Sequence, residues 1–195
     1  MEVKLDKRYP VAASPAQAWQ VLADIRATAA CMPGAQITEQ VDDRHFKGTV
    51  KSKIGPAVMS FGGDIELLGV DAGAMELKLL GKGADKAGSS ATMNLVAHLE
   101  AGATPDTSVL VGRASIVVSG KLAQFGSRLL VPVSDAMLGQ FAGNFSNAAM
   151  AVPAPQAASI SPAGLPAAPA AELNALALLW AALRSWFARL FGKSR

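Results

Sequence analysis

The chain has few of the side chains on which enzyme chemistry most often depends. Its 195 residues include one cysteine, Cys31, and two histidines, His45 and His98. A single cysteine excludes a disulfide within the chain and any paired-cysteine redox or zinc motif. We expect Cys31 to be a small buried side chain rather than a nucleophile, and both histidines to lie on the surface. The sequence therefore predicts no catalytic residue and no metal site.

Charge is scarce as well. Only 17% of the residues are charged and 51% are hydrophobic, which is too apolar for a disordered protein. Residues 172–195 contain four basic side chains and one acidic one, and this segment accounts for the whole net charge of +3. The rest of the chain is neutral, whereas a nucleic-acid-binding domain usually carries a basic patch. We therefore expect no nucleic-acid partner.

The chain also lacks an apolar run long enough to cross a membrane. Residues 175–183 are uninterrupted apolar sequence, but this run has nine residues, whereas a spanning helix needs about 20. Arg184 and Arg189, which follow it, would be costly near a bilayer centre. The first ten residues show no signal-peptide layout. We therefore expect a peripheral protein at the cytoplasmic face of the cell membrane.

Residues 172–195 have the pattern of a helix that lies in a membrane surface. At helical spacing, leucine and aromatic side chains fall on one broad face, and Asn174 and Ser185 lie opposite. Docking on a partner protein or on the chain's own core remains an alternative interpretation. The predicted membrane-binding residues are Leu176, Leu179, Trp180, Leu183, Arg184, Trp186, Phe187, Arg189, Leu190 and Phe191.

Residues 151–171 separate this helix from the rest of the chain. Five prolines among many alanines indicate a semi-rigid linker. We therefore divide the chain into a ligand-binding domain at 1–150, a Pro/Ala-rich linker at 151–171 and a membrane-anchor helix at 172–195.

The pattern of residues 1–150 predicts an α+β domain. A short strand precedes a helix that begins at Ser14-Pro15, where serine caps and proline suits the first turn. A second short helix ends before Pro33, and a long helix occupies residues 122–150, which Pro132 should kink or split. Between them the period is two, which predicts an antiparallel meander of strands at 36–42, 45–54, 57–68, 74–82, 89–100 and 108–119.

Alternation gives the sheet one apolar face, which the long helix must cover. A curved sheet that grips a helix commonly leaves a pocket between them, and methionine adapts to varied apolar ligands. Ordinary core packing is the alternative interpretation of these side chains. No titratable side chain clearly alternates inward. The predicted ligand-binding residues are Met59, Phe61, Leu77, Met93, Leu95, Met137, Phe141 and Phe145.

Five stretches carry a resemblance to a known family, and they are residues 11–15 (VAASP) with Trp19 and Leu22, 30–35 (ACMPGA), 51–56 (KSKIGP), Phe61 with Gly63, and 119–126 (SGKLAQFG). With the order of elements, they make the chain similar to the G subunit of carbon monoxide dehydrogenase, within the START-like helix-grip superfamily. The resemblance implies a non-catalytic accessory protein with a cavity for an isoprenoid quinone and no covalently bound cofactor. It also implies a molybdenum carbon monoxide dehydrogenase, or a related molybdenum hydroxylase, as partner.

The expected function is therefore to bind an apolar ligand and to link this enzyme to membrane lipid and the respiratory quinone pool. Two alternatives remain at this point. A cyclase- or dehydratase-like enzyme on the same fold would need an acid–base pair inside the cavity, and a purely structural membrane tether would have a filled core.

Overall fold

The computed structural model describes residues 1–54 and 57–154. Their strands form one antiparallel sheet of seven, in the order β1-β7-β6-β5-β4-β3-β2. The six-strand meander predicted from alternation is confirmed, and so is the α+β helix-grip class. The strands are β1 (Glu2–Val11), β2 (Ala35–Gln40), β3 (His45–Ile54), β4 (Ala57–Asp71), β5 (Glu76–Asp85), β6 (Ser90–Ala101) and β7 (Ser108–Ser119).

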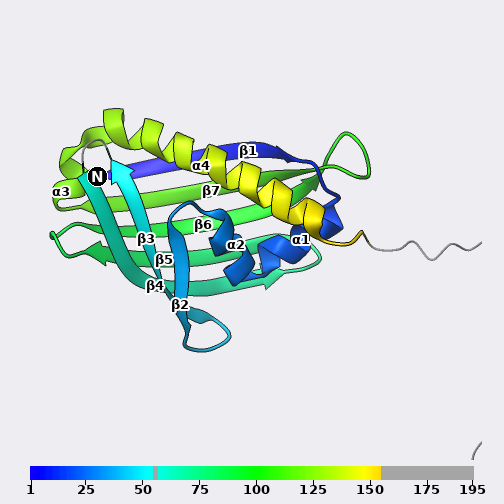
Figure 1. Ribbon diagram of the computed structural model, residues 1–195, viewed down its shortest axis with the longest axis horizontal. Helices are drawn as coiled ribbons and strands as arrows, with labels where there is room; N and C mark the ends of the chain where they lie inside the picture. Colours follow the sequence, from blue (N-terminus) through cyan, green and yellow to red (C-terminus); the bar gives the residue numbers. More distant parts are fainter. Residues whose placement is uncertain (55–56, 155–195) are drawn as a thin grey trace, which may run out of the picture. The chain divides into compact units, whose positions relative to one another are not determined.

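Strand β1 does not lie beside the strand that follows it in the chain. It pairs with β7 along its full length, from Glu2 opposite Val117 to Val11 opposite Ser108. This pairing places β1 at one edge of the sheet and β2 at the other. Between β1 and β2 the chain forms two helices, which cross the concave face of the sheet (Figure 1).

Local capping explains where these helices begin. Helix α1 (Pro15–Ala23) starts with a capping box, in which Ser14 Oγ accepts from the Gln17 backbone N–H and Gln17 Oε1 accepts from the Ser14 N–H. Helix α2 (Ile25–Cys31) is capped by Asp24, whose carboxylate accepts from two backbone N–H groups of the first turn. The expected pair of short helices is therefore confirmed.

The C-terminal helix is interrupted, but not at the proline. Helix α3 (Lys121–Gln124) ends before Gly126, which has φ +66°, and α4 (Gly126–Ala151) then continues through Pro132. We expected Pro132 to kink or split the helix. The split is wrong, because a missing N–H removes one hydrogen bond while the flanking turns keep theirs, and the kink stays a prediction. The break falls where glycine adopts a left-handed backbone conformation that other residues disfavour.

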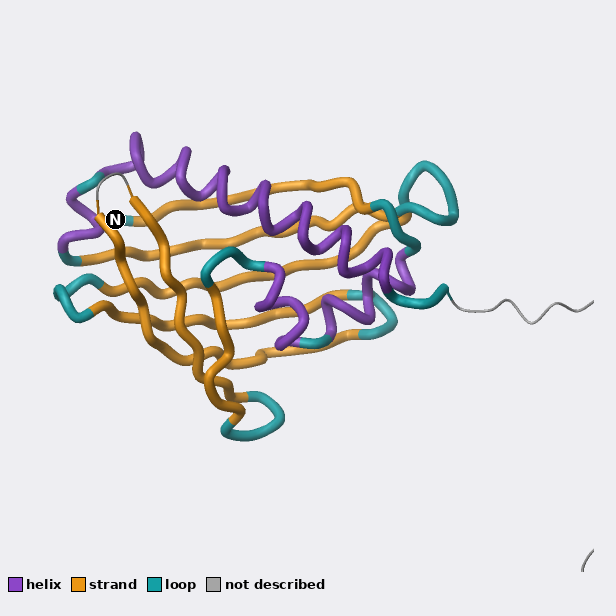
Figure 2. The backbone as a smooth tube through the Cα atoms, viewed as in Figure 1, coloured by secondary structure: helices purple, strands orange, loops and turns teal. Residues whose placement is uncertain are grey.

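The helices all lie on one face of the sheet, with α4 running obliquely across it (Figure 2). Helix α4 is tied to the short helices by polar contacts: Asn144 Nδ2 donates to the Cys31 carbonyl over 2.9 Å, and Gln17 Nε2 donates to the Val152 carbonyl over 2.6 Å. Buried apolar side chains fill the region around α1, α2 and the end of α4. A smaller buried cluster lies around Leu122 and Leu130.

Candidate ligand-binding cavity

A cavity of about 410 Å³ lies between the sheet and the helices. Its wall includes residues of β1, β5, β6 and β7 on one side and of α1, α2 and α4 on the other. This volume falls within the range of about 300–1,000 Å³ typical of small-molecule sites. The lining is apolar almost throughout, so the space suits an apolar ligand better than a charged one.

The strand pattern explains why this space is apolar and why side chains do not fill it. On β5, Leu77, Leu79 and Gly81 alternate inward, while on β7 Gly112 and Ala114 do so. The large inward side chains, Leu77 and Leu79, make the cavity wall apolar. The small inward residues, Gly81, Gly112 and Ala114, leave the space between the sheet and the helices unfilled. A Cβ atom added at Gly112 would meet nothing within 4 Å.

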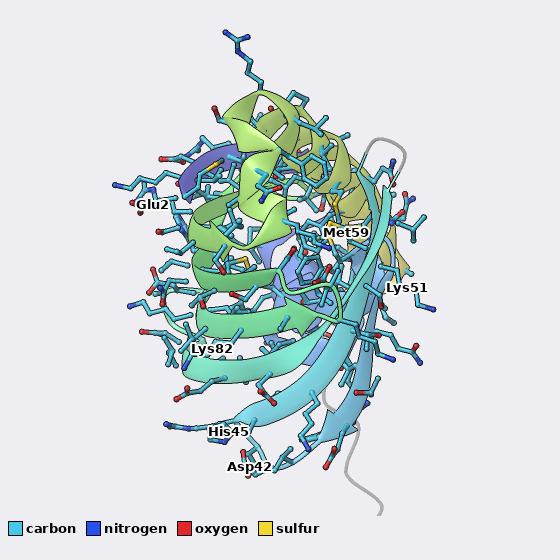
Figure 3. The ribbon with its side chains drawn as sticks, turned by 90° about the vertical axis from the view of Figure 1, so that its left-hand side faces the viewer. Glu2, Asp42, His45, Lys51, Met59 and Lys82 are labelled. Carbon is cyan, nitrogen blue, oxygen red and sulfur yellow. The ribbon has the colours of Figure 1, made fainter. Side chains whose placement is uncertain are left out.

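Figure 3 shows how alternation separates the two faces of the sheet. Lys51 and Lys82 extend from its outer side, whereas Met59 lies on the inner side, toward the helices. Met59 is nevertheless not part of the cavity wall. It belongs to the smaller buried cluster with Val118, Leu122 and Leu130, and Phe61 packs against that cluster.

The eight residues predicted to bind a ligand therefore have different positions. Met59 and Phe61 lie in the smaller cluster, and Phe145 is fully buried in the main core, 5.8 Å from the Phe141 ring. These three do not line the cavity. Periodicity shows that a side chain points toward the helices, but its position along the strand or helix determines whether it packs in a buried cluster or borders the cavity. Ligand binding itself stays a prediction for those that do: Leu77, Met93, Leu95, Met137 and Phe141.

The sequence argument missed two titratable residues in the wall, Lys7 and Tyr9 on β1. The expectation that no titratable side chain alternates inward is wrong, since both share the inner face of β1 with Val3, Leu5 and Val11. The signal was present in the alternation of residues 3–11. A strand face that mixes lysine with apolar residues resembles a solvent-exposed face until its neighbouring elements are known.

Lys7 is held by an acid on the opposite layer. Its Nζ lies 2.9 Å from Oδ1 of Asp135 on α4, and the two side chains are 35% and 44% exposed. The hydrogen bond and the negative charge of Asp135 raise the pKa of Lys7, so the ammonium stays protonated. The pair thus lies at the boundary between the cavity and solvent.

The two histidines and the cysteine do not line this cavity. His45 bonds to Asp42 at an exposed turn, and His98 lies 3.2 Å from Glu100 on the outer face of the sheet. Cys31 is buried, and burial raises the pKa of its thiol, which disfavours the reactive thiolate. Among residues 1–54 and 57–154, no cluster of His, Cys, Asp or Glu side chains is suited to hold a metal ion.

The predicted membrane-binding residues, 176 to 191, lie outside the described residues, as does most of the predicted linker. Within the part of the chain that the structure describes, no helix has the length and hydropathy needed to cross a membrane.

Solved structures of low sequence identity share this architecture. A conserved protein from Geobacillus kaustophilus matches with a TM-score of 0.68 and 18% identity, over 76% of this chain and 95% of that one. An aromatase/cyclase from Streptomyces sp. R1128 matches with a TM-score of 0.57 and 13% identity, over 77% of this chain and 94% of that one. A START superfamily protein from Mycobacterium smegmatis matches with a TM-score of 0.54 and 12% identity, over 75% of this chain and 97% of that one. No curated protein matched.

A curved antiparallel sheet that grips a long helix around an apolar cavity defines the START-like class of proteins. Within that class, the chain belongs to the family of the carbon monoxide dehydrogenase G subunit (CoxG), whose model matches residues 8–150. Family and fold together indicate an accessory protein that binds a hydrophobic ligand.

Proposed function

We propose that this protein binds an isoprenoid quinone in the cavity and links a molybdenum carbon monoxide dehydrogenase, or a related molybdenum hydroxylase, to the cytoplasmic face of the cell membrane. In this role the protein is not an enzyme. It brings the partner's electron acceptor out of the bilayer, where a soluble enzyme has no access to it.

The observation that supports the proposal most directly is the apolar cavity of about 410 Å³. It argues against a purely structural tether, which would need a filled core. Its volume suits a quinone ring with the first part of its isoprenoid chain. Family membership supports the partner, and the predicted amphipathic helix at residues 172–195 supports the membrane.

Ligand binding can be tested on the full chain with ubiquinone-2 and menaquinone-2 as probes. We expect saturable binding at one site per chain, measured by equilibrium dialysis, and an isoprenoid quinone in the lipid extract of protein purified from membranes. A chain that is empty as purified and does not take up either quinone would exclude the carrier function.

Membrane attachment needs a separate test with matched variants. Leu183→Asp and Phe187→Asp put a carboxylate on the predicted apolar face of the tail, whereas Asn174→Asp and Ser185→Asp put the same group on the predicted polar face. We expect the first pair to abolish cosedimentation with anionic vesicles and the second pair to weaken it only slightly. Equal effects of both pairs would contradict an amphipathic anchor.

A second candidate function has one observation in its favour. The Lys7–Asp135 pair and Tyr9 supply the acid–base groups that a cyclase-like enzyme would need near its cavity. This candidate predicts turnover of a polyketide or aldehyde substrate that Lys7→Met abolishes. Saturable quinone binding without turnover of such substrates favours the carrier.

A further inference from the structure

The few polar side chains of the cavity wall are unevenly distributed. Lys7 and Tyr9 come from β1 and Ser134 from α4, while Thr28 of α2 is the fourth. The Thr28 hydroxyl donates to the Val21 carbonyl over 2.8 Å, so its proton is already used within the helical layer. The groups left to serve a ligand therefore belong to the two elements β1 and α4.

These two elements are held together at this point. The Lys7 ammonium and the Asp135 carboxylate join β1 to α4, and Ser134 is the neighbour of Asp135 in the helix. Tyr9 shares the inner face of β1 with Lys7, and alternate residues of a strand lie about 6.6 Å apart. Lysine, tyrosine and serine thus form one polar patch at the side of an otherwise apolar space.

The patch is rich in donors. An ammonium group has three N–H donors, and the bond to Asp135 engages only one of them. Within residues 1–54 and 57–154, the hydroxyl groups of Tyr9 and Ser134 have no hydrogen-bond partner. A ligand that fits this patch should therefore present acceptors at one end and apolar surface over the remainder.

We propose that Lys7, Tyr9 and Ser134 form a subsite for the carbonyl-bearing ring of the ligand, with Asp135 positioning Lys7. This assignment rests on the proposed function for the identity of the ring as a quinone. A quinone ring offers carbonyl acceptors, which an ammonium and a phenol can both satisfy. The isoprenoid chain then occupies the apolar interior beside Leu77, Met93 and Leu95.

The same arrangement predicts selectivity against ligands of equal shape that lack the carbonyl groups. Buried or half-buried donors lose water when a ligand enters, and a hydrocarbon returns no hydrogen bond to them. Selectivity for the oxygenated ring should therefore depend on Lys7 and Tyr9, whereas affinity for the chain should depend on the apolar wall.

The test compares menaquinone-2 with its deoxygenated analogue, 2-methyl-3-geranylnaphthalene, on the full chain. Lys7→Met keeps an apolar stem and removes the ammonium, and Tyr9→Phe removes one hydroxyl. The control is Lys4→Met, the same change on the same strand at a side chain that is 79% exposed. We expect Lys7→Met to weaken quinone binding about 10- to 100-fold and Tyr9→Phe about 3- to 10-fold. Binding of the analogue should change less than about twofold.

A second readout is independent of affinity. Tyr9 is the one tyrosine in the sequence, so incorporation of 3-fluorotyrosine gives a single ¹⁹F resonance. Addition of menaquinone-2 should shift this resonance much more than addition of the analogue, and Lys4→Met should leave both shifts unchanged. For Lys7→Met and Lys4→Met this measurement also detects misfolding, because the resonance would then resemble that of the urea-unfolded chain. Tyr9→Phe carries no tyrosine, so its folding is checked by far-UV circular dichroism.

The outcomes distinguish the subsite from the carrier function. If the wild-type chain binds the quinone but Lys7→Met and Tyr9→Phe bind it as tightly, the subsite is wrong while the carrier function stands. Equal binding of the quinone and the analogue by the wild-type chain also overturns the subsite. If the wild-type chain binds neither, both proposals fail together.

Discussion

Replacing Gly81 with leucine should separate two properties of the domain, its stability and its capacity to hold a ligand. Gly81 lies on β5 in the cavity wall, and a Cβ atom built on it would have Met93 Cε, 3.7 Å away, as its nearest neighbour. This is ordinary van der Waals contact with the end of a flexible side chain. The leucine should therefore extend into the cavity without displacing the backbone.

The free energy of unfolding should rise. Loss of the glycine's freedom in the unfolded chain contributes about 0.5–1 kcal/mol, and burial of a leucine side chain contributes about 1.5–3 kcal/mol. Crowding of Met93 and its neighbours opposes these gains by about 1–3 kcal/mol. We expect a net gain of about 1 kcal/mol, which for a domain of this size raises Tm by roughly 2–4 °C.

Ligand binding should change in the opposite direction. The leucine occupies space that the ligand needs, so the affinity for menaquinone-2 should fall at least about tenfold, or ~1.4 kcal/mol. Thermal unfolding followed by circular dichroism measures the first quantity, and equilibrium dialysis measures the second.

The matched control is Gly62→Leu. Gly62 lies on β4 with an exposed, outward position, and a Cβ atom there would meet nothing within 4 Å. This variant should leave ligand affinity unchanged. Unchanged affinity in Gly81→Leu would show that the cavity is not the binding site, and a large loss of stability would show that the space in front of Gly81 is not free.

Burial and charge lead to three more measurable outcomes. Phe145→Ala should lower the free energy of unfolding, measured by urea denaturation, by about 3–5 kcal/mol, because the Phe145 ring is fully buried. A loss of stability no larger than that of Phe141→Ala would contradict the core position of Phe145. Hydrogen bonds from Arg8 and then His98 hold the pKa of Glu100 at about 2. The wild type should therefore have a higher free energy of unfolding than Glu100→Gln above pH 4.5, and this difference in stability should vanish toward pH 2. A stability difference that does not change with pH would refute this. Iodoacetamide should modify Cys31 slowly in the folded chain at about pH 8 and rapidly in urea, because burial raises the pKa of the thiol in the folded state. Equal modification rates in the two states would contradict a buried thiol.

Several features of the domain could be predicted because they depend on neighbours in the chain. Ser14 and Pro15 mark the start of α1 because capping needs only the first turn of the helix. The faces of β5 and β6 follow from alternation, since successive side chains of any strand point in opposite directions. The inward positions of Leu77 and Met93 could be assigned on this basis alone.

Other features depend on which segments meet. Helical spacing places Phe141 and Phe145 on the same side of α4, but one lines the cavity and the other is core, because the helix crosses the sheet obliquely and its far end lies over α1. The break at Gly126 rather than at Pro132 likewise reflects the path that the chain takes from β7 to the concave face.

Local sequence is enough to predict the strands, their apolar faces, the caps of the short helices and the family, because each of these depends on residues close together in the chain. The tertiary structure is needed to show that β1 pairs with β7 and lies beside α4. That pairing brings Lys7 to Asp135, 2.9 Å apart in space though far apart in sequence. Periodicity places Lys7 on a face of its strand, but the packing of a distant helix determines that this face borders a cavity.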